Sequence, residues 1–353
     1  MTLRIFFAAT ALSAILITGC KPQTNNPANT VETKAELPVV ETFATFDFRP
    51  GNMGISKSGK MIMSLQPLDN PETKLVQLMK DGSYKPYPND AFAKGPNSEL
   101  RAPIGVKIDD AGVAWVLDIG SRKLFSIDTK TDTVKTRFAI PSQTLKNTSF
   151  LQDFALDQKR NRVIIADMTQ GDLKSAPEPA FVVIDLDTGA TRRVAESHPS
   201  MMPEMEGGFA LNPITIDSKY EYVYYGALHG RTMYRVPAAA FDGDSSAVTG
   251  AIQKFGDKSY SDGSSIDTAG NVYNADVESH GYGITRPDGD FELIGKLPEG
   301  QSWTDGITVG SDGYFYSSSN QLDRSAALSG KNTGTGKYLV VRFKPLAPGT
   351  TGR

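Results

Sequence analysis

The stretch DGITVGSDGYFYS (305–317) shows the repeating unit of this chain. An Asp-Gly pair comes first, and an alternating apolar run follows it. A turn containing Asp312-Gly313 then separates this run from a second one. Apolar residues at period two predict β-strands, and Asp-Gly favours a tight turn. The stretch therefore predicts two neighbouring antiparallel strands.

The unit occurs five more times, beginning with GNMGI (51–55), IGVKI (104–108), QDFAL (152–156), NPITI (212–216) and DGSSI (262–266). The last apolar residues of successive copies are 43 to 60 residues apart. A four-stranded propeller blade takes about 50 residues. We therefore expect an all-β chain folded as a six-bladed β-propeller.

The two ends of the folded part are expected to close the ring together. The run KYLVVRF (337–343) predicts the third strand of the sixth blade, and TFATFDF (42–48) predicts its outer strand. Pairing them removes an exposed sheet edge, which would otherwise invite aggregation.

Composition narrows the classes of function. The chain has 353 residues, with 37 Lys and Arg against 40 Asp and Glu. This balance excludes a broad electrostatic surface for nucleic acid, and we expect no nucleic-acid partner. One Cys excludes an intrachain disulfide framework, and three His leave little room for a zinc site. A bound metal would therefore prefer oxygen ligands.

The first 38 residues predict an export signal and an anchor. Arg4 precedes a 13-residue apolar run, 5–17, which suits a signal peptide better than a membrane span of about 20 residues. ITGC (17–20) is similar to a bacterial lipobox, which implies lipidation of Cys20. An ordinary secretory signal with an incidental Cys is the alternative. We expect a signal peptide (1–19), a lipid-anchored flexible tether (20–38) and the propeller (39–353), held at the outer membrane, in the periplasm or at the cell surface.

Polar residues at the starts of the inner strands are expected to gather at one mouth of the central channel. They are Gln152, Asp153, Asn212, Asp262, Asp305 and, after a second strand, Asn320. Converging carboxylates repel unless they are protonated or neutralised, so Asn212, Asp262 and Asp305 are candidate ligands of Ca²⁺ or another divalent cation. The alternative is that each Asp only caps backbone N–H groups.

Four further residues follow second strands and are expected to rim the same opening, namely Asp118, Asp167, His229 and Asp276. For these, capping of loops is again the alternative. The Met-rich segment 198–208 suits either a soft ion such as Cu(I) or a loop over the mouth. The chain has no G-x-S-x-G elbow and no phosphate loop, so we expect no nucleotide cofactor.

Several runs resemble the major royal jelly protein/yellow family, including its bacterial members. They are GVAWVLDIG (112–120), LQDFALD (151–157), YVYYGAL (222–228), MYRVP (233–237), SDG (261–263), WTDG (303–306) and SNQL (319–322). The likeness spans about residues 45–345. It implies a secreted propeller that binds a small molecule, or a tautomerase of the dopachrome type.

A more distant likeness is to the senescence marker protein/gluconolactonase propellers, whose divalent metal is held by Glu, Asn, Asn and Asp. The corresponding residues here are Gly51, Gln152, Asn212 and Asp262. The Glu that the metal-dependent lactonase mechanism uses is therefore replaced by Gly51. Asp305 could supply the missing charge.

These expectations lead to three functions. The first is an exported, lipid-anchored propeller that binds a small molecule, with a divalent cation, at the channel mouth. The second is an enzyme, either a lactonase-type hydrolase or a dopachrome-type tautomerase. The third is a scaffold for protein partners, which a large exposed apolar patch would support. Fold alone does not decide among them.

Overall fold

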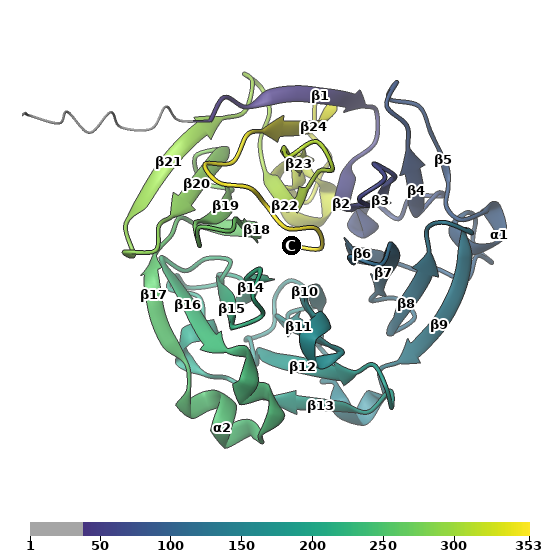
Figure 1. Cartoon of the computed structure of the whole chain (residues 1–353). Helices are drawn as coiled ribbons and strands as arrows, with labels where there is room; N and C mark the ends of the chain where they lie inside the picture. The colour runs from purple at the N-terminus through teal and green to yellow at the C-terminus, as the bar shows by residue number, and fades with distance from the viewer. Residues whose placement is uncertain (1–37) are drawn as a thin grey trace, which may run out of the picture. The chain divides into compact units, whose positions relative to one another are not determined.

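Residues 38–353, the part of the chain that the computed structural model describes, form six four-stranded antiparallel sheets in a ring (Figure 1). The predicted six-bladed β-propeller is confirmed. The first three blades run outward from the channel as β2 (Pro50–Ile55), β3 (Met61–Leu65), β4 (Leu75–Leu78), β5 (Tyr84–Pro86); β6 (Pro103–Ile108), β7 (Val113–Asp118), β8 (Lys123–Asp128), β9 (Thr133–Ala139); and β10 (Leu151–Asp157), β11 (Arg162–Asp167), β12 (Ala180–Asp185), β13 (Thr191–Val194).

The next three blades complete the ring. Their strands are β14 (Leu211–Ile216), β15 (Tyr222–Ala227), β16 (Thr232–Pro237), β17 (Gln253–Asp257); β18 (Ser261–Ile266), β19 (Val272–Asp276), β20 (Gly281–Thr285), β21 (Phe291–Lys296); and β22 (Thr304–Val309), β23 (Phe315–Ser319), β24 (Tyr338–Phe343), β1 (Glu41–Phe46). The first strand, β1, pairs with the last, β24, with Phe46 opposite Tyr338. The predicted closure of the sixth blade by both ends is therefore confirmed.

Helices in the described part are short and lie in the loops. They are α1 (Asp90–Ala93), α2 (Ser245–Gly250), α3 (Ala326–Ser329), and the 3₁₀ turns η1 (Pro67–Asp69), η2 (Ser142–Thr144), η3 (Gln158–Arg160), η4 (Pro199–Met201), η5 (Ala238–Asp242) and η6 (Leu322–Arg324). No helix of residues 38–353 is long and apolar enough to cross a membrane.

The core lies between neighbouring blades. The Phe181 ring of blade 3 meets the Tyr225 ring of blade 4 edge-on, with centroids 4.9 Å apart, and it meets the Phe241 ring edge-on at 5.3 Å. All three side chains are fully buried. Burying a side chain of this size contributes about 2 kcal/mol, so each blade stabilises the next.

Every inner strand carries a β-bulge at the pair of residues that begins the repeat. In blade 5, Ser261 lies opposite Asp276 and Ser264 opposite Asn274, so one extra residue is accommodated at Asp262-Gly263. We expected these pairs to precede the strands, but they lie inside them. A bulge bends the strand and changes the direction of a side chain. In every blade but the second, where the pair is Ile104-Gly105, the bulge therefore turns a polar side chain away from the regular alternation.

Glycine at the bulge allows the inner strands to approach closely. A Cβ on Gly263 would lie 2.7 Å from the Cα of Gly306, and one on Gly306 would lie 1.5 Å from the Asn52 side-chain oxygen. Neither distance is possible for a side chain. The inner strands of blades 5 and 6 therefore meet backbone to backbone, and Gly306 of blade 6 leaves room for the Asn52 side chain of blade 1.

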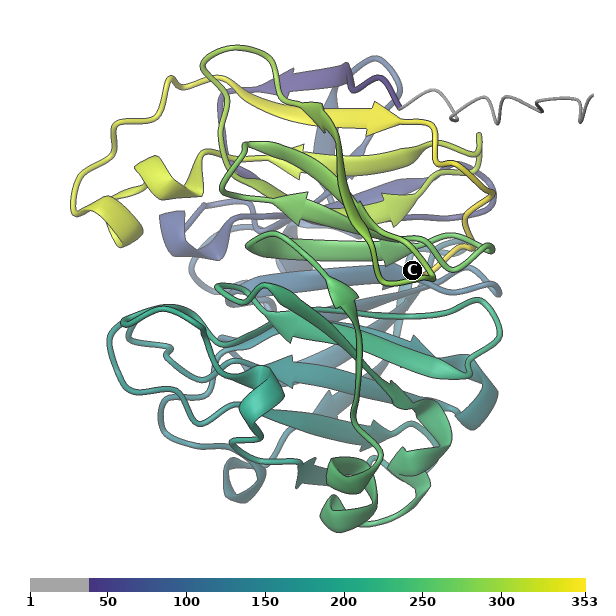
Figure 2. The same ribbon diagram turned by 90° about the vertical axis from the view of Figure 1, so that its left-hand side faces the viewer.

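The segment after β24 crosses one end of the channel. Thr268 N–H donates to the Pro348 carbonyl at 2.8 Å, and Gly349 bridges to Asp267. The Arg353 guanidinium stacks 4.4 Å above the Tyr220 ring. Viewed from the side, the loop with η6 and α3 projects from the opposite end (Figure 2). One end is therefore covered by the chain's own residues, and the inner strands begin at the other end.

Residues 1–37 lie outside the described part of the chain. The predicted signal peptide, the lipidated Cys20 and all but the last residue of the tether fall there.

Candidate site at the channel mouth

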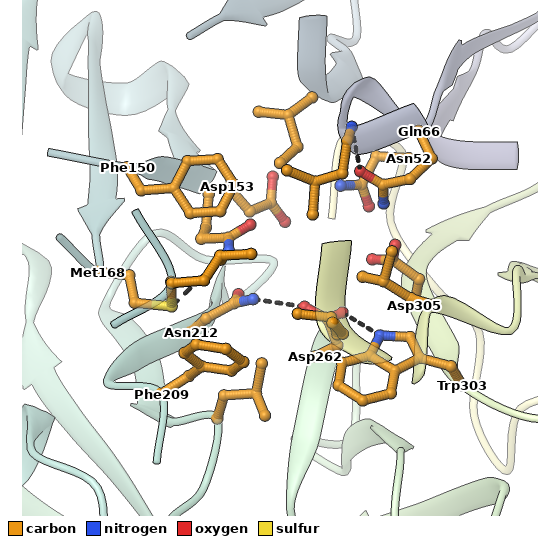
Figure 3. A pocket seen from close by; sticks show the side chains of 17 residues that line it. Asn52, Gln66, Phe150, Asp153, Met168, Phe209, Asn212, Asp262, Trp303 and Asp305 are labelled. Atoms are coloured by element: carbon orange, nitrogen blue, oxygen red, sulfur yellow. Dashed lines mark hydrogen bonds between the residues drawn. The ribbon is translucent and has the colours of Figure 1, made fainter. Parts of the chain in front are cut away.

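A pocket opens to solvent where the inner strands begin. Its floor is polar, and Asn52, Asp153, Asn212, Asp262 and Asp305 converge on it (Figure 3). Its walls are apolar and come from the loops around the mouth, with Phe150, Met168, Phe209, Trp303 and five leucines at positions 68, 173, 228, 322 and 328. Pockets for small ligands combine apolar walls with a few converging polar groups in this way.

The structure brings together the residues selected from the sequence. Gln152, Asp153, Asn212, Asp262 and Asp305 all line the pocket. Asn320 lies behind them and donates from its amide to Asp305 Oδ2 at 2.9 Å. The bulge explains the convergence, because it occurs at the same position in each inner strand.

Asp262 is held on both oxygens by neutral donors. The Asn212 amide donates to Oδ1 at 2.5 Å, and the Trp303 indole N–H donates to Oδ2 at 2.6 Å. Burial raises the pKa of Asp262 well above its ordinary value, and the nearby Asp305 charge raises it further. The two hydrogen bonds oppose this rise. No Lys, Arg or His of the described residues neutralises this carboxylate.

Asp305 has a similar environment in the next blade. Its Oδ1 accepts from the Gly306 N–H at 2.7 Å, and its Oδ2 accepts from Asn320. Burial raises its pKa to about 6, which these hydrogen bonds partly oppose. Asp262 and Asp305 are therefore a pair of buried acids whose ionisation costs free energy.

Asp153 differs because it has a cationic partner. Lys107, from the inner strand of blade 2, lies 3.1 Å from Asp153 Oδ2, and both side chains are buried. Burial still raises the pKa of Asp153, although Lys107 opposes the rise. Its other oxygen, Oδ1, has no hydrogen-bond partner, and neither has Asn212 Oδ1. Buried acceptors are rarely left unpaired in folded proteins, so both oxygens are available to a bound group.

The carboxylates expected at the rim do not line the pocket. Asp118 accepts from the N–H groups of Arg101, Ala102 and Gly120, and is fully buried. Asp167 and Asp276 hold their own loops in the same way. The expectation that they rim the opening was wrong for a physical reason, since a buried Asp after a strand satisfies the unpaired backbone N–H groups of the turn.

His229 also has a structural role in the described chain. Its Nδ1 accepts from Phe209 N–H at 2.8 Å, and its ring lies between Phe209 and Tyr260. Burial lowers its pKa to about 4, so the ring is neutral at neutral pH. In the Met-rich segment, Met201 is buried in the core whereas Met205 is 45% exposed, which favours the loop interpretation over a copper site.

Sequence reasoning missed three members of the site. Trp303, which binds Asp262, was noted only as part of a family-like run. Lys107 and Asn52 stand inside the repeat runs IGVKI (104–108) and GNMGI (51–55), where nothing local marks either residue. The signal for Trp303 was its place two residues before Asp305, at the start of the same strand repeat.

The donors present suit a hard cation only in part. Asp262, Asp305 and the free Asn212 oxygen are oxygen ligands of the kind that Ca²⁺ takes. However, no three His, Cys, Asp or Glu side chains in residues 38–353 are grouped closely enough to hold a metal ion. A cation here would need amide and ligand or water oxygens as well.

Comparisons with known proteins agree with this architecture. Among solved structures, a luciferin-regenerating enzyme is 12% identical, covers 89% of this chain and 98% of its own, and has a TM-score of 0.62. A calcium-binding protein, regucalcin, from Agrobacterium tumefaciens is 17% identical over 88% and 98%, with a TM-score of 0.58. A gluconolactonase from Xanthomonas campestris is 10% identical over 86% and 89%, with a TM-score of 0.58. At these identities the likeness shows the fold alone.

The sequence itself matches a family. No curated protein matches the chain. Residues 102–328 match the family model of the major royal jelly protein. This range contains all seven runs on which the resemblance was based. Because it makes up more than half of the sequence, the chain belongs to the major royal jelly protein family.

Proposed function

We propose that this propeller binds a small molecule with a positively charged group and an apolar body at the channel mouth. One observation carries the proposal. Asp262 and Asp305 are both buried, and the charge of Asp305 acts on Asp262. Neither carboxylate has a cationic partner among the described residues, and both lie beneath apolar and aromatic walls. A cationic ligand would neutralise the floor, and its apolar part would cover the walls.

A divalent cation such as Ca²⁺ is the alternative occupant of the same floor, because two carboxylates carry charge for only one of these cations. Asp262, Asp305 and Asn212 would hold it, and the unpaired Asn212 Oδ1 supports this assignment. Its chemistry would be that of a Lewis acid that polarises a ligand oxygen. The calcium-binding neighbour of the same fold is consistent with it.

Calorimetry with two probes tests both occupants. The folded part is titrated with phenethylamine, which combines an ammonium group with an aromatic ring, and separately with CaCl₂. Asp262→Asn is expected to weaken binding at least about tenfold, or 1.4 kcal/mol. The control is Asp290→Asn, an exposed Asp in a turn, which should bind as the parent does. Equal affinity of the parent and Asp262→Asn for both probes would refute the proposal.

A hydrolase or tautomerase is the second candidate, and one feature favours it. The pKa of Asp305 is raised to about 6, close to the value that suits a general base near neutral pH. Turnover of a lactone or of dopachrome by the parent, lost in Asp305→Asn, would establish an enzyme. A scaffold receives no such support, since only four large apolar side chains of the described residues are exposed.

Export and anchoring complete the proposal. The signal-like run 1–19 and Cys20 predict a lipoprotein. Labelling of cells with a palmitate analogue should mark the parent and not Cys20→Ser, and a labelled Cys20→Ser variant would contradict the anchor.

A further inference from the structure

Arg49 lies between β1 and β2, where the chain passes from the outside of blade 6 to the inside of blade 1. Its side chain is only 3% exposed. Its guanidinium stacks 4.8 Å from the Tyr338 ring. A buried guanidinium needs several acceptors, and those that Arg49 finds belong to different loops.

The three guanidinium nitrogens bind three separate places. Nη1 binds Asp69 Oδ2 at 2.6 Å, and Nη2 donates to Asn332 Oδ1 at 2.8 Å. Nε donates to the Asn320 carbonyl at 2.8 Å. Asp69 ends η1, whereas Asn320 and Asn332 enclose the loop with η6 and α3. One side chain therefore joins two loops of different blades.

Both loops form part of the pocket wall. Leu68 of η1 lines the pocket from one side, and Leu322 and Leu328 line it from the other. Asn320 lies at the base of the second loop, and its amide donates to Asp305. Arg49 is thus connected to the apolar wall through Asp69, which adjoins Leu68. It is connected to the floor through Asn320, which binds Asp305.

We propose that Arg49 is a positioning residue that holds these two loops together as a lid over the pocket, and that ligand passes when they part. The role of the lid in ligand binding rests on the proposed function. Arg suits this role because its planar fork donates in fixed directions, whereas Lys is a point charge that cannot hold three acceptors while stacking on a ring. Arg49→Lys therefore keeps the charge but loosens the lid.

Trp303 provides a readout that needs no ligand. It lines the pocket and is 8% exposed, and Trp115 is the other Trp of the chain. In a Trp115→Phe background, quenching by acrylamide reports the access of small molecules to Trp303. Arg49→Lys is expected to raise the quenching constant at least about twofold, because local opening becomes less costly.

Asp69→Asn and Asn332→Ala remove one arm each and leave Arg49 in place, so they test the lid if Arg49→Lys unfolds. Each should raise quenching by a smaller amount. The control is Glu41→Gln, which removes the exposed Glu41–Arg342 pair of the same blade without touching either loop. Quenching that stays at the parent value in Arg49→Lys and in both single-arm variants, all of them folded by circular dichroism, would overturn the proposal.

Ligand kinetics then separate the lid from the proposed function. If phenethylamine binds the parent, Arg49→Lys should release it at least about tenfold faster in stopped-flow displacement, with dissociation affected more than association. Unchanged release would overturn the role of the lid in binding. Raised quenching without any phenethylamine binding would leave the lid in place and refute the ligand class.

Discussion

The Trp303 indole N–H donates a 2.6 Å hydrogen bond to Asp262 Oδ2, joining the start of blade 6 to the inner strand of blade 5. Trp303 has a positive φ of 56° and is almost fully buried. A non-glycine residue in this region costs free energy and persists where its surroundings fix it. The apolar wall and the acidic floor of the pocket are therefore linked by one side chain.

Trp303→Phe should raise the pKa of Asp262 and destabilise the protein. The variant keeps an aromatic ring but leaves a buried carboxylate oxygen without its donor, which costs about 1–3 kcal/mol. Urea unfolding of the parent and the variant measures this cost. A Trp303→Phe variant as stable as the parent would contradict the role of the hydrogen bond.

The pH dependence of stability should show the burial of Asp305. Its folded pKa of about 6 lies above its ordinary 3.8, so the folded state holds the proton more tightly than the unfolded state. The contribution of this group to the free energy of unfolding is fully present below pH 4. It falls by on the order of 3 kcal/mol as the pH rises through about 6.

Asp305→Asn should therefore gain stability relative to the parent as pH rises from 4 to 7. The measurement is urea unfolding of both proteins across this range. Parallel curves for the parent and the variant would contradict the raised pKa.

The buried pair Lys107–Asp153 should show strong coupling. Lys107→Met leaves a buried carboxylate without its cation, which costs about 3–5 kcal/mol. Asp153→Asn added to it removes the lone charge, so the double variant should recover part of the loss. Free energies of unfolding for the four proteins of the cycle give the coupling. Additive effects would mean that the pair does not interact.

Gly263→Ala should strongly destabilise the fold. Its Cβ would meet backbone of blade 6 at 2.7 Å, and backbone there cannot move without opening the ring. We expect a loss of at least about 3 kcal/mol. Gly250→Ala is the matched control, because nothing lies within 4 Å of that position, and it should be neutral or stabilising. A neutral Gly263→Ala would contradict the close approach of the strands.

Most of the fold could be predicted from the sequence, because each blade repeats the same alternation of apolar and polar residues and the same kind of turn. The six copies, the closing strands β1 and β24 and the polar cluster were all readable in this way. The bulge was not, because a bulge differs from a strand start only in its pairing partner. For the same reason Asp118 and Asp262 looked alike, although one binds backbone and the other lies open to a pocket.

Residues whose role depends on blade-to-blade contact were also invisible. Lys107 meets Asp153 across 46 residues of sequence, and Arg49 meets Asn332 across 283. Nothing local marks either cation as different from a surface one. Only the closed ring brings each to its acceptors.

A crystal of the folded part grown with MnCl₂ and phenethylamine tests the central claim most directly. Manganese gives anomalous signal, and the amine gives its own density. The account predicts that at least one of them lies on the pocket floor within contact of Asp262 and Asp305. The account would be contradicted if both manganese and the amine lay elsewhere, and if the two carboxylates had no partners besides Asn212, Trp303, Gly306 and Asn320.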